Sequence, residues 1–411
     1  MWTPIRAVVG FEKPVWVLCV THMFIDVYSL IHVALIPVYI REFNLGLLEA
    51  SLVATVPSLV QLLMNIPSGL LANHLNAKQL LSVSMIIEGV SALFVSQTNN
   101  FWLLILAVSM MKISSPVYHV SGLSQLSRLV SPERTSRSVG LHGAFGSLGS
   151  AMGVVSLAFF LSSLGWRWTY LAWAFPIIAW GFIASISSQP ETRALEKQHL
   201  GKKDRLSAVL TTFSAGLVIF IVVIGLREVG ITSISTFMTT YLVRMRGLPE
   251  ATASLIFGLG PFIGIVGSLN SGYLGEKLNP KRALGVTIIG CVMSLSLVAV
   301  CSQLYLLTIV YLLYRFFSDS VWVPINTIVA HITPGRQREF GYSAYLFTEG
   351  LVMSVAPIAA AKVIELSSIW YIFPFSIVFL AMSLAVLQIL PRSTRHGNPD
   401  SMVDLGGRIH L

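Results

Sequence analysis

Long apolar segments recur along the whole chain, and they decide what it can fold into. Each is about twenty residues long, which at a rise of 1.5 Å per residue spans the roughly 30 Å hydrocarbon core of a bilayer. Charged residues make up only 11% of the 411 residues, against about 25% in a soluble protein. Too few remain to cover a water-facing surface. The pattern predicts an all-α integral membrane protein and argues against a soluble enzyme or a nucleic-acid-binding domain.

The apolar segments predict twelve transmembrane helices. The stretch 283–330 is far too long for one crossing, so it is divided into two spans. The seventh segment is longer than a crossing needs, and its first residues are expected to lie outside the membrane. The predicted spans lie near residues 14–40, 48–71, 79–97, 101–125, 138–163, 168–188, 208–243, 251–274, 283–303, 305–331, 341–364 and 368–390.

The distribution of basic residues predicts which side each end faces. Of the 27 Lys and Arg residues, 19 fall in the N-terminus, in the loops after even-numbered helices and in the tail. The opposite loops hold only Arg41, Arg167, Arg244 and Arg246. Because cytoplasmic loops are enriched in Lys and Arg, both termini are predicted to be cytoplasmic. This bias also explains the net charge of +9, so no nucleic-acid partner is expected.

A polar stretch near the middle of the chain divides two similar halves. When the sequence is shifted by 203 residues, the segments 68–81 and 271–284 match at seven of fourteen positions. A parallel repeat of six helices is a known transporter architecture. The predicted units are therefore an N-terminal half (1–188), a cytoplasmic linker (189–207), a C-terminal half (208–390) and a cytoplasmic tail (391–411).

The repeated loop resembles the G-x-L-a-D-r-x-G-r-K signature that major facilitator superfamily transporters carry between helices 2 and 3, and more loosely between helices 8 and 9. The resemblance implies a conformational latch at these loops. Asn73 stands where the family usually has Asp, so Glu276 is expected to matter more than Asn73. The latch residues that the resemblance implies are Gly69, Asn73 and Lys78 in the first half, and Gly272, Glu276, Lys277 and Lys281 in the second.

Helices 1, 4 and 5 resemble one branch of that superfamily. His22, Asp26 and Tyr28 in the pattern H-x-x-x-D-x-Y, the segment 115–119 (SPVYH) and a glycine-rich helix 5 are similar to the fosmidomycin-resistance-like efflux carriers. Val120 departs from the proline usual in that branch. The helix 5 glycines are open to two interpretations: close helix packing, or the antiporter motif of the superfamily. The resemblance implies a multi-pass protein of the cell membrane that exports small molecules by alternating access.

Eight Asp, Glu, Lys and Arg residues are predicted at membrane depth. Each costs about 2.5 to 3.5 kcal/mol at a helix centre on insertion scales, so they must face a cavity or one another. Six of the eight lie on helices 1, 4, 7 and 10, which line the central cavity in the superfamily that the sequence resembles. The eight are Asp26, Glu88, Lys112, Arg227, Glu228, Arg315, Asp319 and Glu349.

Helical spacing groups these residues into polar stripes and predicts two kinds of site. Asp26, one turn from His22, is the first candidate for proton coupling, and Glu349 and Asp319 are alternatives. Three cations suit a carboxylate or phosphonate group of a substrate. The residues predicted to line the substrate cavity are Lys112, Tyr118, His119, Arg227, Glu228, Arg315, Trp322 and Asn326.

Structural roles stay open for several of these residues. Arg315 and Asp319 can neutralise each other along one helix, and His22 and Asp26 can form a static bond. The neighbours Arg227 and Glu228 point about 100° apart, which predicts that they do not share a face. Glu88 is expected to be a peripheral packing residue. Glu349 is either an interface hydrogen-bonding group or a proton site.

The sequence contains no H-E-x-x-H, G-x-S-x-G or Walker motif, so no enzyme activity, cofactor or metal is expected. We therefore predict a monomeric secondary transporter that exports small anionic or zwitterionic compounds in exchange for protons. Two alternatives stay open: an uptake symporter or uniporter for an organic acid or sugar, and a membrane sensor or scaffold that transports nothing.

Overall fold

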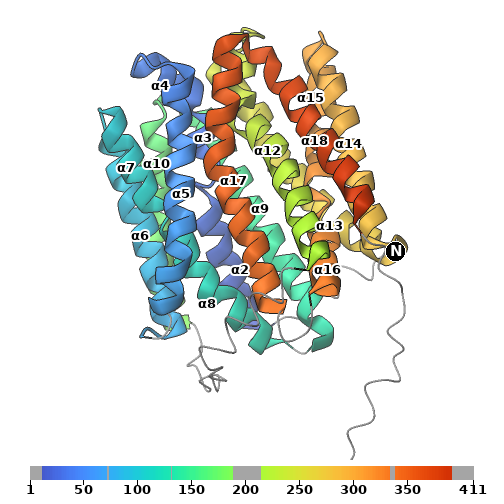
Figure 1. The fold of residues 1–411 in the computed structure, drawn as a ribbon. Helices are drawn as coiled ribbons and strands as arrows, with labels where there is room; N and C mark the ends of the chain where they lie inside the picture. Colours follow the sequence, from blue (N-terminus) through green and yellow to red (C-terminus); the bar gives the residue numbers. More distant parts are fainter. Residues whose placement is uncertain (1–11, 72–73, 131, 188–213, 334–337, 391–411) are drawn as a thin grey trace, which may run out of the picture.

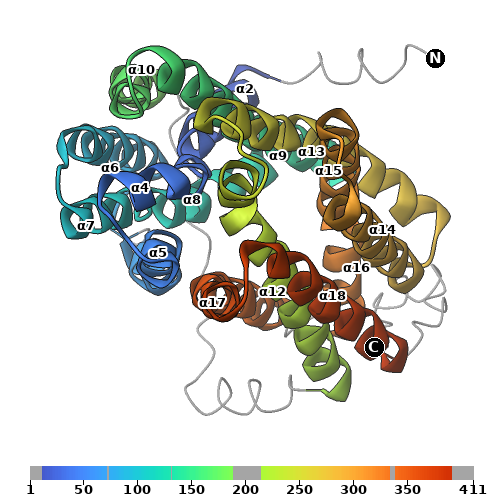
Figure 2. The same cartoon turned by 90° about the horizontal axis from the view of Figure 1, so that it is seen from above.

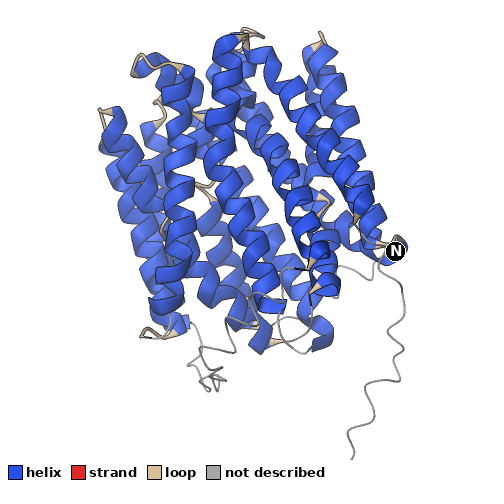
Figure 3. Ribbon diagram, viewed as in Figure 1, coloured by secondary structure: helices blue, strands red, loops and turns tan. Residues whose placement is uncertain are grey.

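The computed structural model describes residues 12–71, 74–130, 132–187, 214–333 and 338–390. Within these ranges it contains helices and loops but no strand (Figure 3). Twelve helical segments are long and apolar enough to cross a membrane, which confirms the predicted number of spans. The boundaries of the predicted linker and tail lie outside the described residues.

The first six spans consist of nine helices, because the first and fourth spans are interrupted. We call this group, from Lys13 to Ser187, the N-terminal half (Figure 1). Its helices are α2 (Lys13–Asp26), α3 (Ile31–Ala34), α4 (Ile36–Glu42), α5 (Leu47–Leu71), α6 (Ala77–Gln97), α7 (Phe101–Met111), α8 (Ser114–Leu129), α9 (Pro132–Ser163) and α10 (Arg167–Ser187).

The last six spans form the C-terminal half, in which the tenth span is interrupted. Its seventh span starts at Ala215, and the predicted extension before it lies outside the described residues. The helices are α12 (Ala215–Arg244), α13 (Glu250–Lys277), α14 (Pro280–Val300), α15 (Leu304–Asp319), α16 (Trp322–Ile332), α17 (Arg338–Leu366), the short 3₁₀ helix η2 (Ile369–Tyr371) and α18 (Ile372–Ile389).

The three interruptions correct the prediction that spans 1, 4 and 10 are continuous. At each one the backbone tightens to 3₁₀-type bonds. The amide of Ser29 donates to the Asp26 carbonyl over 3.1 Å, that of Ile113 to Met110 over 3.1 Å, and that of Ser320 to Phe317 over 3.3 Å. Tight turns inside a helix often mark a hinge, and apolar periodicity does not reveal them.

The repeated loops start their helices in the same way. Asn76 caps α6 by accepting a hydrogen bond from the Gln79 amide over 3.0 Å, and Asn279 caps α14 by accepting one from the Lys281 amide over 3.0 Å. An Asn at this position satisfies a backbone donor that has no partner within the helix. The two asparagines are equivalent in the sequence repeat, so the repeat is also a repeat of local structure.

The halves meet along two helix pairs, α5 with α17 and α9 with α13 (Figure 2). Glycines allow the close approach in both pairs. A methyl group added at Gly350 would lie 2.8 Å from the Leu62 side chain, and one at Gly258 would lie 3.1 Å from the Val154 side chain. The helices therefore pack closely along the boundary between the halves, as small residues permit in membrane proteins.

Polar contacts also join the halves at one end of the bundle. We call this the short-loop end; it carries the connections 43–46, 98–100, 164–166, 245–249, 301–303 and 367–368. Arg41 pairs with Glu250. The Leu48 amide donates to Glu365 Oε1 over 2.9 Å, and Thr239 Oγ1 donates to the Val33 carbonyl over 3.4 Å. The structure is thus closed across the halves at this end.

We expect loss of these contacts to shift the protein toward a state that is open at the short-loop end. Spin labels at Asn99→Cys and Ser367→Cys, in a Cys301→Ser background, report the separation of the halves there. The double variant Arg41→Gln, Glu365→Gln should populate longer distances. An exposed ion pair contributes up to about 1 kcal/mol, which is about a fivefold change in the equilibrium.

Arg167→Gln is the matched control for this experiment. Arg167 pairs with Glu42 at the same end, over 2.6 Å, but within the N-terminal half. An equal shift in the control and in the double variant would show that the contacts between the halves are not what keeps this end closed.

Candidate functional site

His22 and Asp26 form an ion pair one turn apart on α2. Asp26 Oδ2 lies 3.3 Å from His22 Nε2, and the other ring nitrogen, Nδ1, lies 2.8 Å from the backbone carbonyl of His142 on α9. The His22 side chain is only 10% exposed, whereas 26% of Asp26 is exposed. The pair is therefore anchored on one side by α9 and reachable on the other.

The two contacts of His22 require a proton within the pair. A carbonyl oxygen only accepts hydrogen bonds, so Nδ1 must carry the hydrogen that it donates to His142. In a neutral imidazole Nε2 is then a bare acceptor that faces the Asp26 carboxylate. Two acceptors at this distance repel unless one proton lies between them. With Nδ1 donating to His142, the contact between Nε2 and Asp26 is attractive only when the pair carries one proton.

His142 and Tyr118 extend this pair into a network across three helices. The Tyr118 hydroxyl donates to the Leu18 carbonyl over 2.9 Å and lies 2.6 Å from His142 Nε2, which must then be the donor to Tyr118. The rings of His22 and His142 stack at 4.0 Å, and the His119 ring lies 5.1 Å from His22. Tyr118 is fully buried, so it ties α2, α8 and α9 together.

His142 was not among the predicted site residues, although the sequence contains a signal for it. It lies on one face of α9 with Gly146, Gly149 and Gly153, at positions i, i+4, i+7 and i+11. Added methyl groups at Gly149 and Gly153 would collide with the backbone of the first span, at Met23 and at Val27, and one at Gly146 would lie 2.6 Å from Asp26 Oδ2. The close-packing interpretation of these glycines is therefore confirmed, and the same face carries His142 to the pair.

Lys112 lies in the interruption between α7 and α8. Its ammonium donates over 3.2 Å to the Ser29 carbonyl, which belongs to the interruption of the first span. The charges of Glu88 and Asp26 act on Lys112, but no carboxylate of the described residues lies within 4.0 Å of it. Glu88 is 3% exposed and accepts a hydrogen bond from Ser114. It thus belongs to the polar interior of the half and not to its periphery.

Arg227 and Glu228 on α12 form an ion pair with each other, although neighbouring positions of a helix point about 100° apart. The arginine side chain is long enough to curve around the helix to its neighbour. Arg227 Nη2 also donates to the Ser318 carbonyl over 2.6 Å, next to the interruption of the tenth span. Both side chains are buried.

Arg315 and Asp319 also neutralise each other, which is one of the two roles that the sequence left open. Arg315 Nη2 donates to both carboxylate oxygens of Asp319, over 2.9 and 3.2 Å. The pair packs against the glycine face of α13, where a methyl group at Gly260 would lie 3.0 Å from Arg315 Cγ and one at Gly264 would meet Asp319. Asp319 remains 25% exposed, like Asp26.

The remaining predicted residues of the C-terminal half lie on α16 and α17. Trp322, beyond the interruption on α16, is 48% exposed, and the Asn326 amide donates to its carbonyl over 2.7 Å. Glu349 on α17 is partly buried, and the charges of Glu228 and Arg227 act on it. The interruptions of the first and fourth spans are thus joined by Lys112, and Arg227 contacts the helix just before the interruption of the tenth.

The predicted latch residues are described only in part. Lys281, at the start of α14, donates to the carbonyls of Gln388 and Leu390 over 2.8 and 2.5 Å, within its own half. Gly69 lies in α5 and Lys78 in α6. Asn73 lies outside the described residues, as do the side chains of Glu276 and Lys277, and Gly272 is described only as part of α13. The latch stays a prediction.

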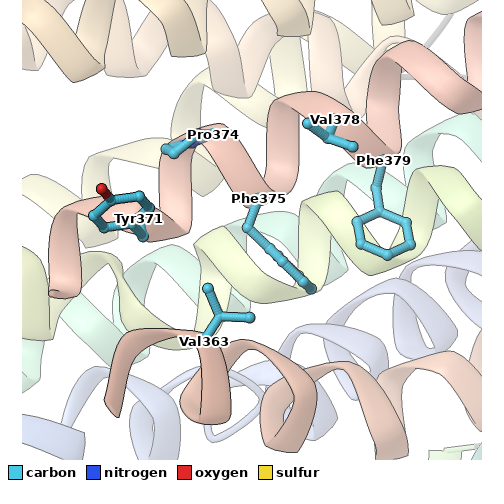
Figure 4. Close-up of a pocket in the computed structure, with 6 residues that line it drawn as sticks. All are labelled: Val363, Tyr371, Pro374, Phe375, Val378 and Phe379. Carbon is cyan, nitrogen blue, oxygen red and sulfur yellow. The ribbon is translucent and has the colours of Figure 1, made fainter. Parts of the chain in front are cut away.

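Neither a metal site nor an apolar groove competes with these clusters among the described residues. Among the described residues, no group of three or more His, Cys, Asp and Glu side chains is arranged to hold a metal ion. A groove between α17 and α18 is apolar, with Val363 and Phe375 pointing toward one another across it (Figure 4). It contains no charged side chain. Its lining residues are Val363, Tyr371, Pro374, Phe375, Val378 and Phe379.

Comparison with known proteins agrees with this architecture. The family model of the Major Facilitator Superfamily matches residues 17–357, and again residues 271–404. The chain belongs to the major facilitator superfamily. It is a multi-pass protein of the cell membrane that transports small molecules, and not an enzyme.

Individual relatives are distant in sequence. The fosmidomycin resistance protein of Escherichia coli (strain K12) is 21% identical over 322 residues, which cover 77% of this chain and 78% of that protein. A bacterial homologue of the human lysosomal transporter Spinster, inward-facing and unoccupied, superposes with a TM-score of 0.75 at 15% identity, covering 93% and 98% of the two chains. A mutant of the nucleoside transporter NupG gives 0.76 at 13% identity, covering 92% and 100%. These structures share the fold.

We expect Gly149→Ala to destabilise the protein and Gly140→Ala to leave its stability unchanged or slightly higher. The added methyl group at Gly149 would meet the backbone of Met23, which cannot move aside, whereas the space around Gly140 is open. Overpacking costs about 1 to 3 kcal/mol. Thermal unfolding of the purified variants measures the difference, and equal melting temperatures would contradict close packing of α2 on α9.

Proposed function

We propose that the protein is a proton-coupled exporter that works by alternating access, with both termini in the cytoplasm and the monomer as the working unit. The observation that carries the proposal is the His22–Asp26 pair, whose hydrogen bonds account for one proton. The distribution of Lys and Arg supports the orientation. The efflux-type name of the Escherichia coli relative supports the direction of transport.

Proton release from the pair has a direct mechanical consequence. Without the proton, two acceptors face each other and the contact must open. Asp26 is the last residue of α2, and the interruption of the first span follows it at once. Gly146 of α9 lies against both side chains, so they cannot separate toward α9. Both side chains belong to α2, so opening of the pair changes how α2 packs against Gly146 of α9, and this change would link the proton to the conformational change.

The charged residues around the His22–Asp26 pair fit a zwitterion better than other classes of substrate. Arg227 and Arg315 are each paired with a carboxylate, whereas Lys112 has only a backbone carbonyl as hydrogen-bond partner among the described residues. An anionic group of the substrate can pair with Lys112. A cationic group of the same molecule can replace the proton on Asp26, so that substrate and proton exchange at one carboxylate.

Asp26→Asn is expected to abolish export driven by a pH gradient while preserving folding. The asparagine amide can still donate to His22 Nε2, so it imitates the protonated pair but cannot release a proton. Expressing cells are tested for resistance to a panel of toxic zwitterions and to fosmidomycin, and proteoliposomes for uptake driven by an imposed pH gradient. Glu42→Gln, which alters an ion pair at the short-loop end, is the control.

Transport by Asp26→Asn that still follows an imposed pH gradient would sink the proposal. Loss of folded protein in this variant would instead favour a static His22–Asp26 bond. Size-exclusion profiles of the purified variants separate the two results, because only the second changes the fraction of folded protein.

Lys112→Gln is expected to raise the concentration of zwitterion needed for half-maximal transport by about tenfold or more. A hydrogen bond to a charged group contributes about 1.5 to 3 kcal/mol, and each 1.4 kcal/mol is a tenfold change in affinity. Compounds of the same size without an anionic group should keep their half-maximal concentration. An equal loss for both kinds of compound would indicate that Lys112 only holds the two interruptions together.

A further inference from the structure

We propose that the C-terminal half binds a second proton, on Glu349, independently of the His22–Asp26 pair. The proposal deepens the proposed function, because the exporter would then hold one proton in each half. The protonation of Glu349 itself does not depend on what the protein transports, and it can be tested without a substrate.

Charge balance in the N-terminal half provides the reference. At membrane depth this half carries one cation, Lys112, and two carboxyl groups, Asp26 and Glu88, and the charges of both act on Lys112. If all three groups are ionised, their net charge is one negative charge. The hydrogen bonds of His22 independently require one proton in the His22–Asp26 pair, and that proton brings the sum to zero. The charge count and the hydrogen bonds of His22 therefore both indicate that this half is neutral, as a medium of low dielectric constant demands.

In the C-terminal half, pairing each arginine with a carboxylate leaves one carboxyl group without a partner. Arg227 is paired with Glu228, and Arg315 with Asp319. Glu349 has no such partner: no Arg or Lys nitrogen of the described residues lies within 4.0 Å of it. The half becomes neutral when Glu349 carries a proton.

The arginine nearest to Glu349 is already engaged. Arg227 donates from Nη1 to Glu228 and from Nη2 to the Ser318 carbonyl, so both of its terminal nitrogens already have acceptors other than Glu349. Glu228, the neighbour of Arg227 on α12, adds a negative charge that acts on Glu349. Tyr345 lies one turn before Glu349 on α17. An ionised Glu349 would therefore face the carboxylate of Glu228, while Arg227, the cation whose charge also acts on Glu349, already pairs with that carboxylate.

The other helices packed on α17 offer no cation at this depth. These are α5, α16 and α18. The only charged residue of α5 is Glu49, in its first turn. α18 has no Asp, Glu, Lys, Arg or His, and the only such residue of α16 is His331, in its last turn. Along α17 itself, Arg338 and Lys362 are eleven and thirteen residues from Glu349, which is about 16 and 20 Å by helical rise.

The position of Glu349 connects its proton to the boundary between the halves. α17 packs along α5 of the N-terminal half, and the next residue, Gly350, faces Leu62 of α5. A charge on Glu349 would thus appear beside the surface along which the halves move. Its proton is held where a change in the contact between the halves would alter its surroundings.

Infrared difference spectroscopy of the full-length protein in lipid bilayers tests the proposal. A protonated carboxyl group has a carbonyl-stretch band that an ionised carboxylate lacks. At neutral pH we expect the wild type to show such a band, to lose it on a step to high pH, and to shift it when the protein is labelled with ¹³C-glutamate. Glu349→Gln should remove the glutamate band, and Asp26→Asn should leave it in place.

Glu88→Gln is the matched control, because Glu88 is a second buried glutamate, which lies in the other half and accepts a hydrogen bond from Ser114. The glutamate band should persist in this variant. Absence of any ¹³C-glutamate-sensitive band in the wild type would overturn the proposal, even where Glu349→Gln fails to fold. A band that disappears in Glu88→Gln and persists in Glu349→Gln would overturn it as well. Neither result touches the Asp26 experiment, so the two proposals fail separately.

Discussion

Neutrality at membrane depth is the constraint on which the arrangement of the polar residues depends. A bilayer offers no water to an unpaired charge, so each charged side chain must find a partner inside the protein. Here the partners include backbone carbonyls at interrupted helices as well as opposite charges. Lys112 donates to Ser29 of the first span, and Arg227 to Ser318 of the tenth. In both halves a cation of one helix thus satisfies a carbonyl near the interruption of another. The charged clusters and the interruptions therefore stabilise each other.

Glycine faces let two of these clusters sit deep between helices. Gly146 of α9 lies against the His22–Asp26 pair, and Gly260 and Gly264 of α13 lie against Arg315 and Asp319. The helices α9 and α13 also pack on each other where the halves meet, with Gly258 against Val154. The two contacting helices thus each touch an i, i+4 pair: α9 touches His22–Asp26, and α13 touches Arg315–Asp319. A shift of either ion pair acts on a helix that forms the boundary between the halves.

The fold could be predicted from the sequence because hydrophobic length and repeat are properties of long segments. Span number and family were right, and the repeat aligned Asn76 with Asn279, which the structure shows to cap α6 and α14. The site was harder for a physical reason: helical spacing describes one helix, whereas partners come from others. It predicted Arg315 with Asp319 and His22 with Asp26, both i, i+4 pairs. It missed His142, which reaches His22 through its backbone carbonyl and ring, and the pairing of Arg227 with Glu228. The interruptions near Asp26, Lys112 and Asp319 left no mark in the apolar pattern.

The chemistry of the partners gives the two halves different tasks. Arginine stays protonated at any physiological pH, so the pairs of Arg227 and Arg315 keep their charge and form a fixed frame. Histidine is the side chain that changes its charge in that range, and it occurs at the centre of the N-terminal cluster, where one of its nitrogens is held by a carbonyl and only the other faces a carboxylate. Loss of one proton therefore changes the contact between His22 and Asp26 from attraction to repulsion, while the ion pairs of Arg227 and Arg315 stay intact. Under the proposed function, the first span is thus the part that responds to the proton of the His22–Asp26 pair, while the ion pairs of Arg227 and Arg315 keep their contacts.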